Sequence, residues 1–336
     1  MRKIYNLIMF KKMVNFIVHC PSNSLKNGGA ETLHQFAYHL KKNNFNTFLN
    51  YFPDEKIALP DNLTKYNIPR TNFADNKDHI NIIPEVKTSR TKHISKGKII
   101  IYWLSVDGYY RRSLDAPFWK NWNYYRKTFS DRVFLFKLKK YSHLANSYYA
   151  KDFLKKKDID SFELKGYISN FFNGEFNIKD KKNIILYNPA KDKSHVIKVK
   201  KFFPNYNFIA LENLDKSELK KLYSSSKIYL DLGTHPGRER MPREAASMGC
   251  VILVANRGSV CNDFDVPIED MYKIDIDNKR SLNKLNHLVD DIFENFEKHL
   301  LKFDDYRKKI SYENEYRLFD KRVLEFANNM VEDIKL

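Results

Sequence analysis

The stretch from Ser226 to Ser259 constrains the fold more than any other part of the chain. An apolar, β-branched run over 227–232 predicts a buried strand, and a second apolar run over 251–255 predicts another. Between them a charged loop, 233–241, leads to Pro242, which suits the first position of a helix because its fixed φ is helical and its missing N–H is not needed there. Strand, loop, helix and strand form one unit of an open α/β sheet, in which ligands bind beyond the carboxyl ends of the strands.

This loop and helix carry guanidinium, imidazole and carboxylate groups that suit a phosphate and sugar hydroxyls: His235, Arg238, Glu239, Arg243 and Glu244. A helix N-terminus favours an anion because its first backbone N–H groups have no partner within the helix. The alternative is that Glu244 only caps the helix, because a carboxylate at the third helical position can reach back to a backbone N–H. Capping does not account for the neighbouring arginines, so we favour ligand binding.

Strand and helix patterns alternate along most of the remaining chain. Further strands are expected at 13–19, 46–51, 98–105, 133–136, 184–187 and 207–211. Helices are expected at 30–42, within 143–157 (capped by Asn146 or Ser147), at 194–203, from a cap at Ser217, and through the tail from residue 281. Residues 53–96 are polar and predict loops and short elements. The short spacing favours two doubly wound parallel sheets.

Three other positions are candidates for binding or catalysis. Gly28 and Gly29 stand between a strand and a helix, where backbone N–H groups can approach a phosphate, although close helix packing explains the pair about as well. The loop 187–195 contains Asn188, Lys191 and Lys193; lysine can neutralise phosphate, although any loop of a lysine-rich chain contains lysines. Asp107, just past a predicted strand, is the best-placed carboxylate for a catalytic base.

The run REAASMGCVILVANRGS, residues 243–259, resembles the donor-site segment of GT-B glycosyltransferases, especially those of family 4. The run GGAETLHQFAYHL, residues 28–40, resembles their first loop and helix, which face the donor diphosphate. The resemblance implies two Rossmann-like domains facing a cleft, and it places ribose binding on Glu244. The family's sugar-contacting glutamate falls on Pro236 here, and the nearest carboxylate is Glu239.

The resemblance implies a glycosyltransferase that moves a sugar from a nucleotide-sugar donor to a glycan or lipid-linked acceptor in surface polysaccharide synthesis, with retention of configuration. We expect an acceptor domain at 1–166, a donor domain at 167–311, and a helix at 312–336 that returns to the first domain. The expected catalytic residues are Glu239 and Asp107. The expected donor-binding residues are Gly28, Gly29, Asn188, Lys191, Lys193, His235, Arg238, Arg243, Glu244, Gly258 and Ser259.

No cofactor and no metal are expected, because basic side chains and helix N-termini can carry the charge of the leaving diphosphate. The DFD run at 263–265 is interpreted as a loop rather than a metal site. A sugar-nucleotide epimerase of GT-B architecture and a non-catalytic basic binding protein stay open as alternatives.

The composition limits which classes of binding partner are expected. The net charge is +18, from 59 basic and 41 acidic residues, and it predicts attraction to anions. No nucleic-acid-binding motif is present, so we expect no nucleic acid but allow peripheral contact with the inner face of an anionic membrane. Three cysteines without metal spacing, no apolar run of ~18 residues and no signal peptide at 1–12 predict a cytoplasmic protein.

Overall fold

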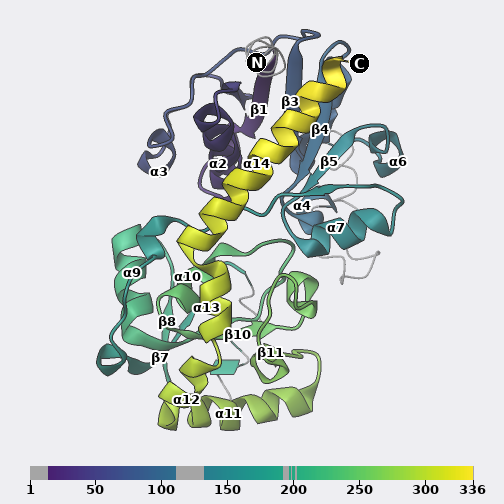
Figure 1. Ribbon diagram of the computed structural model, residues 1–336. Coiled ribbons are helices and arrows are strands. Elements are labelled where there is room, and N and C mark those ends of the chain that lie inside the picture. Colours follow the sequence, from purple (N-terminus) through teal and green to yellow (C-terminus); the bar gives the residue numbers. More distant parts are fainter. Residues whose placement is uncertain (1–13, 111–131, 192–196, 198, 201–202, 336) are drawn as a thin grey trace. The chain divides into compact units, whose positions relative to one another are not determined.

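The computed structural model describes residues 14–110, 132–191, 197, 199–200 and 203–335. The chain divides into two compact units, Met1–Gly166 with Arg317–Leu336, and Tyr167–Tyr316. Each unit is built on one parallel sheet with helices packed against it (Figure 1). The predicted α/β class with two doubly wound sheets is therefore confirmed.

The sheet of the first unit has six strands in the order β2-β1-β3-β4-β5-β6, and every neighbouring pair is parallel. Side chains along β1, β3 and β4 are almost all buried, as expected for a sheet covered on both faces. The strands are β1 (Asn15–Pro21), β2 (Asn46–Phe52), β3 (His79–Pro84), β4 (Lys98–Trp103), β5 (Ser142–Ala145) and β6 (Phe162–Glu163).

Two segments of this unit differ from expectation. β3 lies in the middle of the sheet, within the segment 53–96 for which loops and short elements were expected. Its apolar run is interrupted by Asn81, whose buried amide oxygen lies 3.0 Å from Nε2 of His19 on β1. Residues 133–136 do not form a strand, because Phe134 is the N-cap and Phe136 the second residue of a short helix, α6 (Leu135–Leu138), and both rings are exposed.

Side-chain capping sets the start of α7. Ser147 caps α7 by accepting the N–H of Ala150 at 3.1 Å, which decides between the two caps considered. The helix expected at 30–42 begins earlier, at Gly28. The helical segments before residue 160 are η1 (Ser22–Ser24), α2 (Gly28–Lys42), α3 (Asp61–Thr64), η2 (Glu85–His93), α4 (Val106–Tyr110), α6 and α7 (Tyr148–Lys155).

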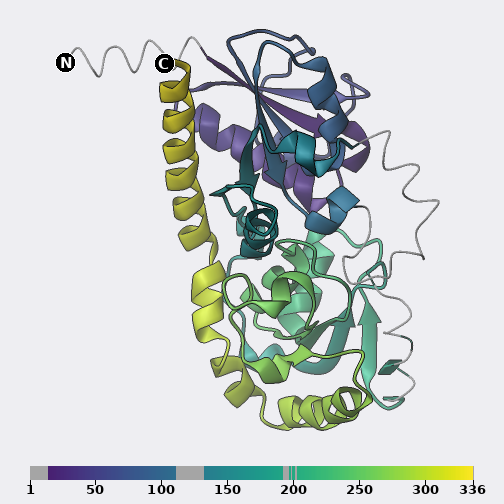
Figure 2. The ribbon, with the colours of Figure 1, turned by 90° about the vertical axis from the view of Figure 1, so that its right-hand side faces the viewer.

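The last helix, α14 (Tyr312–Lys335), belongs to the first unit from Arg317 onward, where it lies beside α2 (Figures 1 and 2). Phe326 packs on Phe36 with ring centroids 6.0 Å apart, and Asp320 accepts a hydrogen bond from Nδ1 of His39 at 2.5 Å. Leu318 is 55% exposed, whereas the neighbouring Phe319 is buried.

The sheet of the second unit has five parallel strands in the order β11-β10-β9-β7-β8. The strands are β7 (Lys182–Tyr187), β8 (Asn207–Ala210), β9 (Ser226–Asp231), β10 (Val251–Ala255) and β11 (Lys273–Ile274). The helical segments are η4 (Asn170–Phe172), η5 (Ile178–Asp180), α9 (Lys216–Ser225), α10 (Arg240–Ser247), η6 (Gly258–Cys261), η7 (Asp270–Tyr272), α11 (Lys279–Glu294), α12 (Phe296–Leu301) and α13 (Asp304–Ile310).

Two helix starts in this unit differ from expectation. The N-cap of α9 is Asp215, which forms a reciprocal capping box with Glu218, so Ser217 is not the cap. The helix α10 begins at Arg240, two residues before Pro242. Most of the helix expected at 194–203 lies outside the described residues. Among the helices in the described part of the chain, none is long and apolar enough to cross a membrane.

Glu85 is a buried carboxyl at the carboxyl end of β3, with 1% of its surface exposed. Its Oε2 accepts the N–H of Leu104, just past β4, at 3.0 Å. Burial outweighs this hydrogen bond and raises the pKa of Glu85 from 4.5 to about 7. Glu85 therefore couples the stability of the first unit to pH.

We predict that Glu85→Gln removes this coupling. The folded protein binds the proton more tightly than the unfolded chain, so the stabilising effect is complete below pH 4.5 and is lost as pH rises through about 7. The shift corresponds to about 3 kcal/mol of unfolding free energy. Urea unfolding followed by tryptophan fluorescence measures it, because all 3 tryptophans precede residue 166. The same pH slope in wild type and Glu85→Gln would contradict the assignment, and Glu163→Gln, at a half-buried position of this unit, is the control.

Candidate functional site

The site is built where the strands of the second unit end. Asp231, the last residue of β9, is 2% exposed and accepts the N–H of Gly233 at 3.1 Å. Lys191 follows the neighbouring parallel strand β7, so both residues reach the same edge of the sheet. The Nζ of Lys191 lies 3.2 Å from Asp231 and 2.5 Å from Glu239.

Lys191 and Asp231 keep each other charged. Burial alone would lower the pKa of Lys191, but Asp231 and Glu239 outweigh it and raise the pKa above its usual value. Burial alone would raise the pKa of Asp231, but Lys191 beside it lowers the pKa below its usual value. The lysine at this edge is thus a fixed cation held between two carboxylates.

Glu244 does not cap α10. Because the helix begins at Arg240, Glu244 is its fifth residue rather than its third, and the capping alternative is wrong. Glu244 is 2% exposed, and its Oε1 accepts hydrogen bonds from Nη2 and Nε of Arg240 at 3.0 and 3.2 Å. This pair, one turn apart, holds the carboxylate on the first turns of α10.

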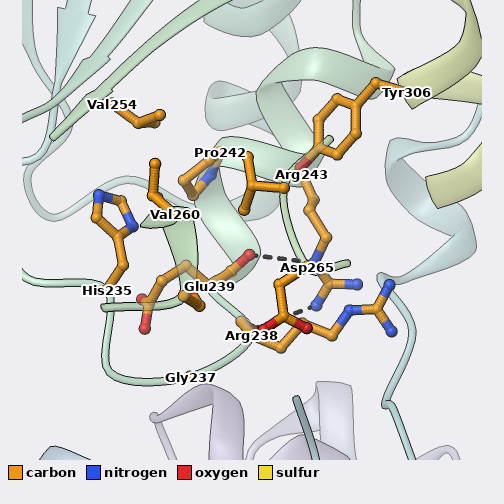
Figure 3. Close-up of a pocket in the computed structure, with 12 residues that line it drawn as sticks. His235, Gly237, Arg238, Glu239, Pro242, Arg243, Val254, Val260, Asp265 and Tyr306 are labelled. Atoms are coloured by element: carbon orange, nitrogen blue, oxygen red, sulfur yellow. Dashed lines mark hydrogen bonds between the residues drawn. The ribbon is translucent and has the colours of Figure 1, made fainter. Parts of the chain in front are cut away.

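Arg238 and Arg243 share one carboxylate. Nη1 of Arg243 lies 2.9 Å from Oε2 of Glu315, and Arg238 bonds its Oε1. Glu315 comes from the first turn of α14 and is 4% exposed. Arg243 also donates to the carbonyl oxygens of Glu239 at 3.1 Å and of Arg238 at 3.4 Å, which ties the loop to the helix (Figure 3).

These pairs form what we call the α10 charge cluster, in which four cations face four carboxylates. The contacts that define it join loop 187–191, the β9–α10 loop, α10 itself and the start of α14. Its members are Lys191, Arg238, Arg240, Arg243, Asp231, Glu239, Glu244 and Glu315. A guanidinium, with five N–H donors, can bind a carboxylate and a phosphate at once.

A second loop meets the β9–α10 loop at Gly258. The carbonyl of His235 accepts the N–H of Ser259 at 2.8 Å, and Gly258 has a φ of 57°. A Cβ on Gly258 would lie 2.1 Å from that carbonyl oxygen, so only glycine fits. Burial lowers the pKa of His235, so the buried ring is neutral at pH 7.

A small hollow opens between these loops and α13. Val254 and Val260 lie on one side of it, and the side chains of Arg238, Arg243 and Asp265 gather on another (Figure 3). The remaining lining residues are His235, Gly237, Glu239, Pro242, Ser259, Val266 and Tyr306. The hollow is thus apolar on one side and charged on another.

The structure gathers most of the expected donor-binding residues at this edge. Asn188 lies against the start of α10, because its amide contacts the sulfur of Met241 at 3.1 Å. Lys193 lies outside the described residues. The residues brought together are Asn188, Lys191, His235, Arg238, Glu239, Arg243, Glu244, Gly258 and Ser259.

Three expected site residues belong to the first unit. Gly28 is the first residue of α2, and a Cβ on Gly29 would lie 3.3 Å from Cδ1 of Leu104, which supports the close-packing explanation for this glycine. Asp107 lies on α4, just beyond the carboxyl end of β4.

Sequence reasoning missed three residues of this edge. Asp231 could have been found, because it is the carboxylate that ends a predicted strand. Glu315 and Tyr306 have no local signal, since each reaches the site from a helix distant in the chain. Asp263 and Asp265 lie in the predicted loop, and the described residues hold no group of three or more His, Cys, Asp or Glu side chains arranged for a metal.

Comparison with known proteins adds the fold family. No family model matches the sequence, and no curated protein matches it. The structure is similar to a glycosyltransferase from Rickettsia africae (14% identity, 93% of this chain and 99% of that chain, TM-score 0.58). It is also similar to sucrose-phosphate synthase from Thermosynechococcus elongatus (8%, 96% and 98%, TM-score 0.59). A third similar structure is an α-glucosyltransferase in complex with UDP-glucose and DNA (11%, 95% and 99%, TM-score 0.56). The fold is that of the GT-B glycosyltransferases, as the sequence resemblance predicted.

We predict that Gly258→Ala lowers the free energy of unfolding by at least about 2 kcal/mol, because the methyl group meets a backbone carbonyl at a positive φ. Gly174→Ala is the matched control, since a Cβ there meets only Nζ of Lys220, at 3.8 Å. Urea unfolding followed by circular dichroism compares the two variants. Equal stability of both would contradict the close approach of the two loops.

Removing Glu315 tests the shared carboxylate. We expect Glu315→Ala to cost about 3–5 kcal/mol of unfolding free energy, because it leaves two largely buried guanidinium groups without their counter-charge. Glu313→Ala, two residues earlier at an exposed position, is expected to change stability by less than about 0.5 kcal/mol. The same unfolding experiment measures both, and a Glu315→Ala variant as stable as Glu313→Ala would refute the assignment.

Proposed function

We propose that the chain is a glycosyltransferase that moves a sugar from a nucleotide-sugar donor to a glycan or lipid-linked acceptor in surface polysaccharide synthesis. The observation that carries this proposal is the α10 charge cluster, which lies at a helix N-terminus beyond the carboxyl ends of β7 and β9. The GT-B fold supports it, because similar structures include a glycosyltransferase and an α-glucosyltransferase with UDP-glucose.

The donor is proposed to bind with its diphosphate at the start of α10. Lys191 and Arg238 carry positive charge there, and backbone N–H groups of the first helical turn add to it. Glu244, held by Arg240, is proposed to accept hydrogen bonds from ribose hydroxyls. Glu239, 23% exposed and bonded to Lys191, is proposed to lie beside the donor sugar.

In the transfer, the bond between the anomeric carbon and the diphosphate oxygen breaks and a bond to an acceptor hydroxyl oxygen forms. The electron pair of the broken bond stays on the diphosphate, whose growing negative charge Lys191 and Arg238 stabilise. The acceptor hydroxyl gives up its proton, and Asp107 is the proposed base in the first unit. Retention of configuration, family 4 membership and independence of a metal are further parts of the proposal.

The proposed cellular location follows from the proposed class of acceptor. A lipid-linked or surface polysaccharide acceptor and the net charge of +18 favour a cytoplasmic enzyme that contacts an anionic membrane peripherally. Nucleic acid is not proposed as a partner.

The proposal is tested by donor binding to Glu244→Gln. A thermal-shift panel of nucleoside diphosphates and their sugars identifies the donor, since a ligand at 100 times its Kd stabilises the protein by about 2.7 kcal/mol. Titration calorimetry with that donor is then expected to show ten- to hundredfold weaker binding for Glu244→Gln, roughly the effect of losing a charge-assisted hydrogen bond. Glu212→Gln, an exposed glutamate just past β8 at the same edge, is the control with unchanged affinity.

Product analysis separates the transferase from its alternatives. Release of nucleoside diphosphate only when an acceptor glycan is added supports transfer. Formation of a free sugar or an epimer without acceptor would instead indicate an epimerase. A panel without any stabilising nucleotide, or equal donor affinity of wild type and Glu244→Gln, would contradict the proposed site.

A further inference from the structure

The first unit exposes two aromatic rings that its core does not use. Phe134 and Phe136 are 52% and 65% exposed and flank the start of α6. Their rings stack on one another, with centroids 5.8 Å apart and planes inclined by 21°, so they form one apolar surface. Phenylalanine has no polar group that would favour this exposure, and an exposed aromatic pair marks an interaction site.

Lysines surround this pair. Lys137, Lys139 and Lys140 follow it directly and are all exposed. The Nζ of Lys137 lies 5.9 Å from the centroid of the Phe136 ring, so charge and ring share one surface. The sequence contains no Asp or Glu from residue 132 to residue 151, which leaves the segment strongly positive.

Lysines continue onto α7, where some of them pair with carboxylates. Lys139 lies 3.5 Å from Asp158, just beyond the end of α7, and Lys156 lies 2.7 Å from Asp152. The same end of α7 carries the exposed Lys155, Lys156 and Lys157. In Figure 1, α6 and α7 lie on one side of the first unit, next to β5. Aromatic rings with lysines around them match the two parts of an anionic bilayer, which offers an apolar layer beneath a negatively charged surface.

We propose that Phe134, Phe136 and Lys137–Lys140 form a membrane-docking surface, with the rings entering the headgroup region of an anionic bilayer and the lysines contacting lipid phosphates. This inference rests on the peripheral membrane contact proposed above for a lipid-linked acceptor. A bilayer is favoured over single-stranded nucleic acid because the two rings face each other, whereas base stacking needs ring faces that are open. The charges also lie beside the rings rather than along a groove.

The experiment is co-sedimentation of the full chain with phosphatidylcholine vesicles, with and without phosphatidylglycerol. Phe134→Ser/Phe136→Ser is expected to weaken binding at least tenfold. Lys137→Gln/Lys139→Gln/Lys140→Gln is expected to weaken it about a hundredfold, from about fivefold for each lysine near an anionic surface. Both variants change exposed side chains, so their thermal unfolding should match wild type.

Leu301→Ser is the matched control, because Leu301 is 66% exposed in the second unit and has lysines on either side in the sequence. It is expected to bind vesicles as wild type does. Wild-type binding that requires phosphatidylglycerol and is lost in both patch variants supports the proposal.

The proposal would be overturned if wild type did not bind the vesicles, or if Leu301→Ser lost as much vesicle binding as the patch variants. Full vesicle binding by Phe134→Ser/Phe136→Ser would also overturn it, because it would show attraction by net charge alone. Tighter binding to single-stranded DNA than to anionic vesicles, lost in the same variants, would assign the surface to nucleic acid instead. Because no sugar donor is needed, failure here leaves the transferase proposal intact.

Discussion

The candidate site of the second unit depends on the pairing of buried charges. An unpaired buried ion costs several kcal/mol, so each cation at the start of α10 lies against a carboxylate. Lys191 is held between Asp231 and Glu239, and two arginines share Glu315. These contacts tie the β9–α10 loop to Lys191, to α10 and to Glu315. A diphosphate would meet preorganised donors, the condition under which electrostatic stabilisation of a transition state costs little reorganisation.

One helix provides buried contacts to both units. The first turn of α14 supplies Glu315 to the α10 charge cluster, and the part from Arg317 onward packs on α2 through Phe326 and binds His39 through Asp320. The carboxylate that orders the candidate donor site thus comes from the same helix that completes the core of the first unit.

The strands around the site could be predicted because continuous apolar runs at 227–232 and 251–255 have one stable placement, in a sheet covered on both faces. The same argument missed β3, where the buried Asn81 interrupts the pattern and is satisfied by a histidine on another strand. Pro242 suggested a helix start two residues too late, because proline is tolerated throughout the first turn. Glu315 could not be predicted, since its partners are set by tertiary packing rather than by spacing. The roles assigned to the site residues stay predictions.

The central claim is that the start of α10 binds the diphosphate of a sugar-nucleotide donor. A crystal structure of the chain with the nucleoside diphosphate that stabilises it most would test this directly. The account predicts diphosphate oxygens within hydrogen-bonding distance of Lys191, Arg238 or the first backbone N–H groups of α10, with the ribose hydroxyls at Glu244. A nucleotide bound elsewhere, with the pairs of the α10 charge cluster unchanged and no ligand beside them, would contradict it.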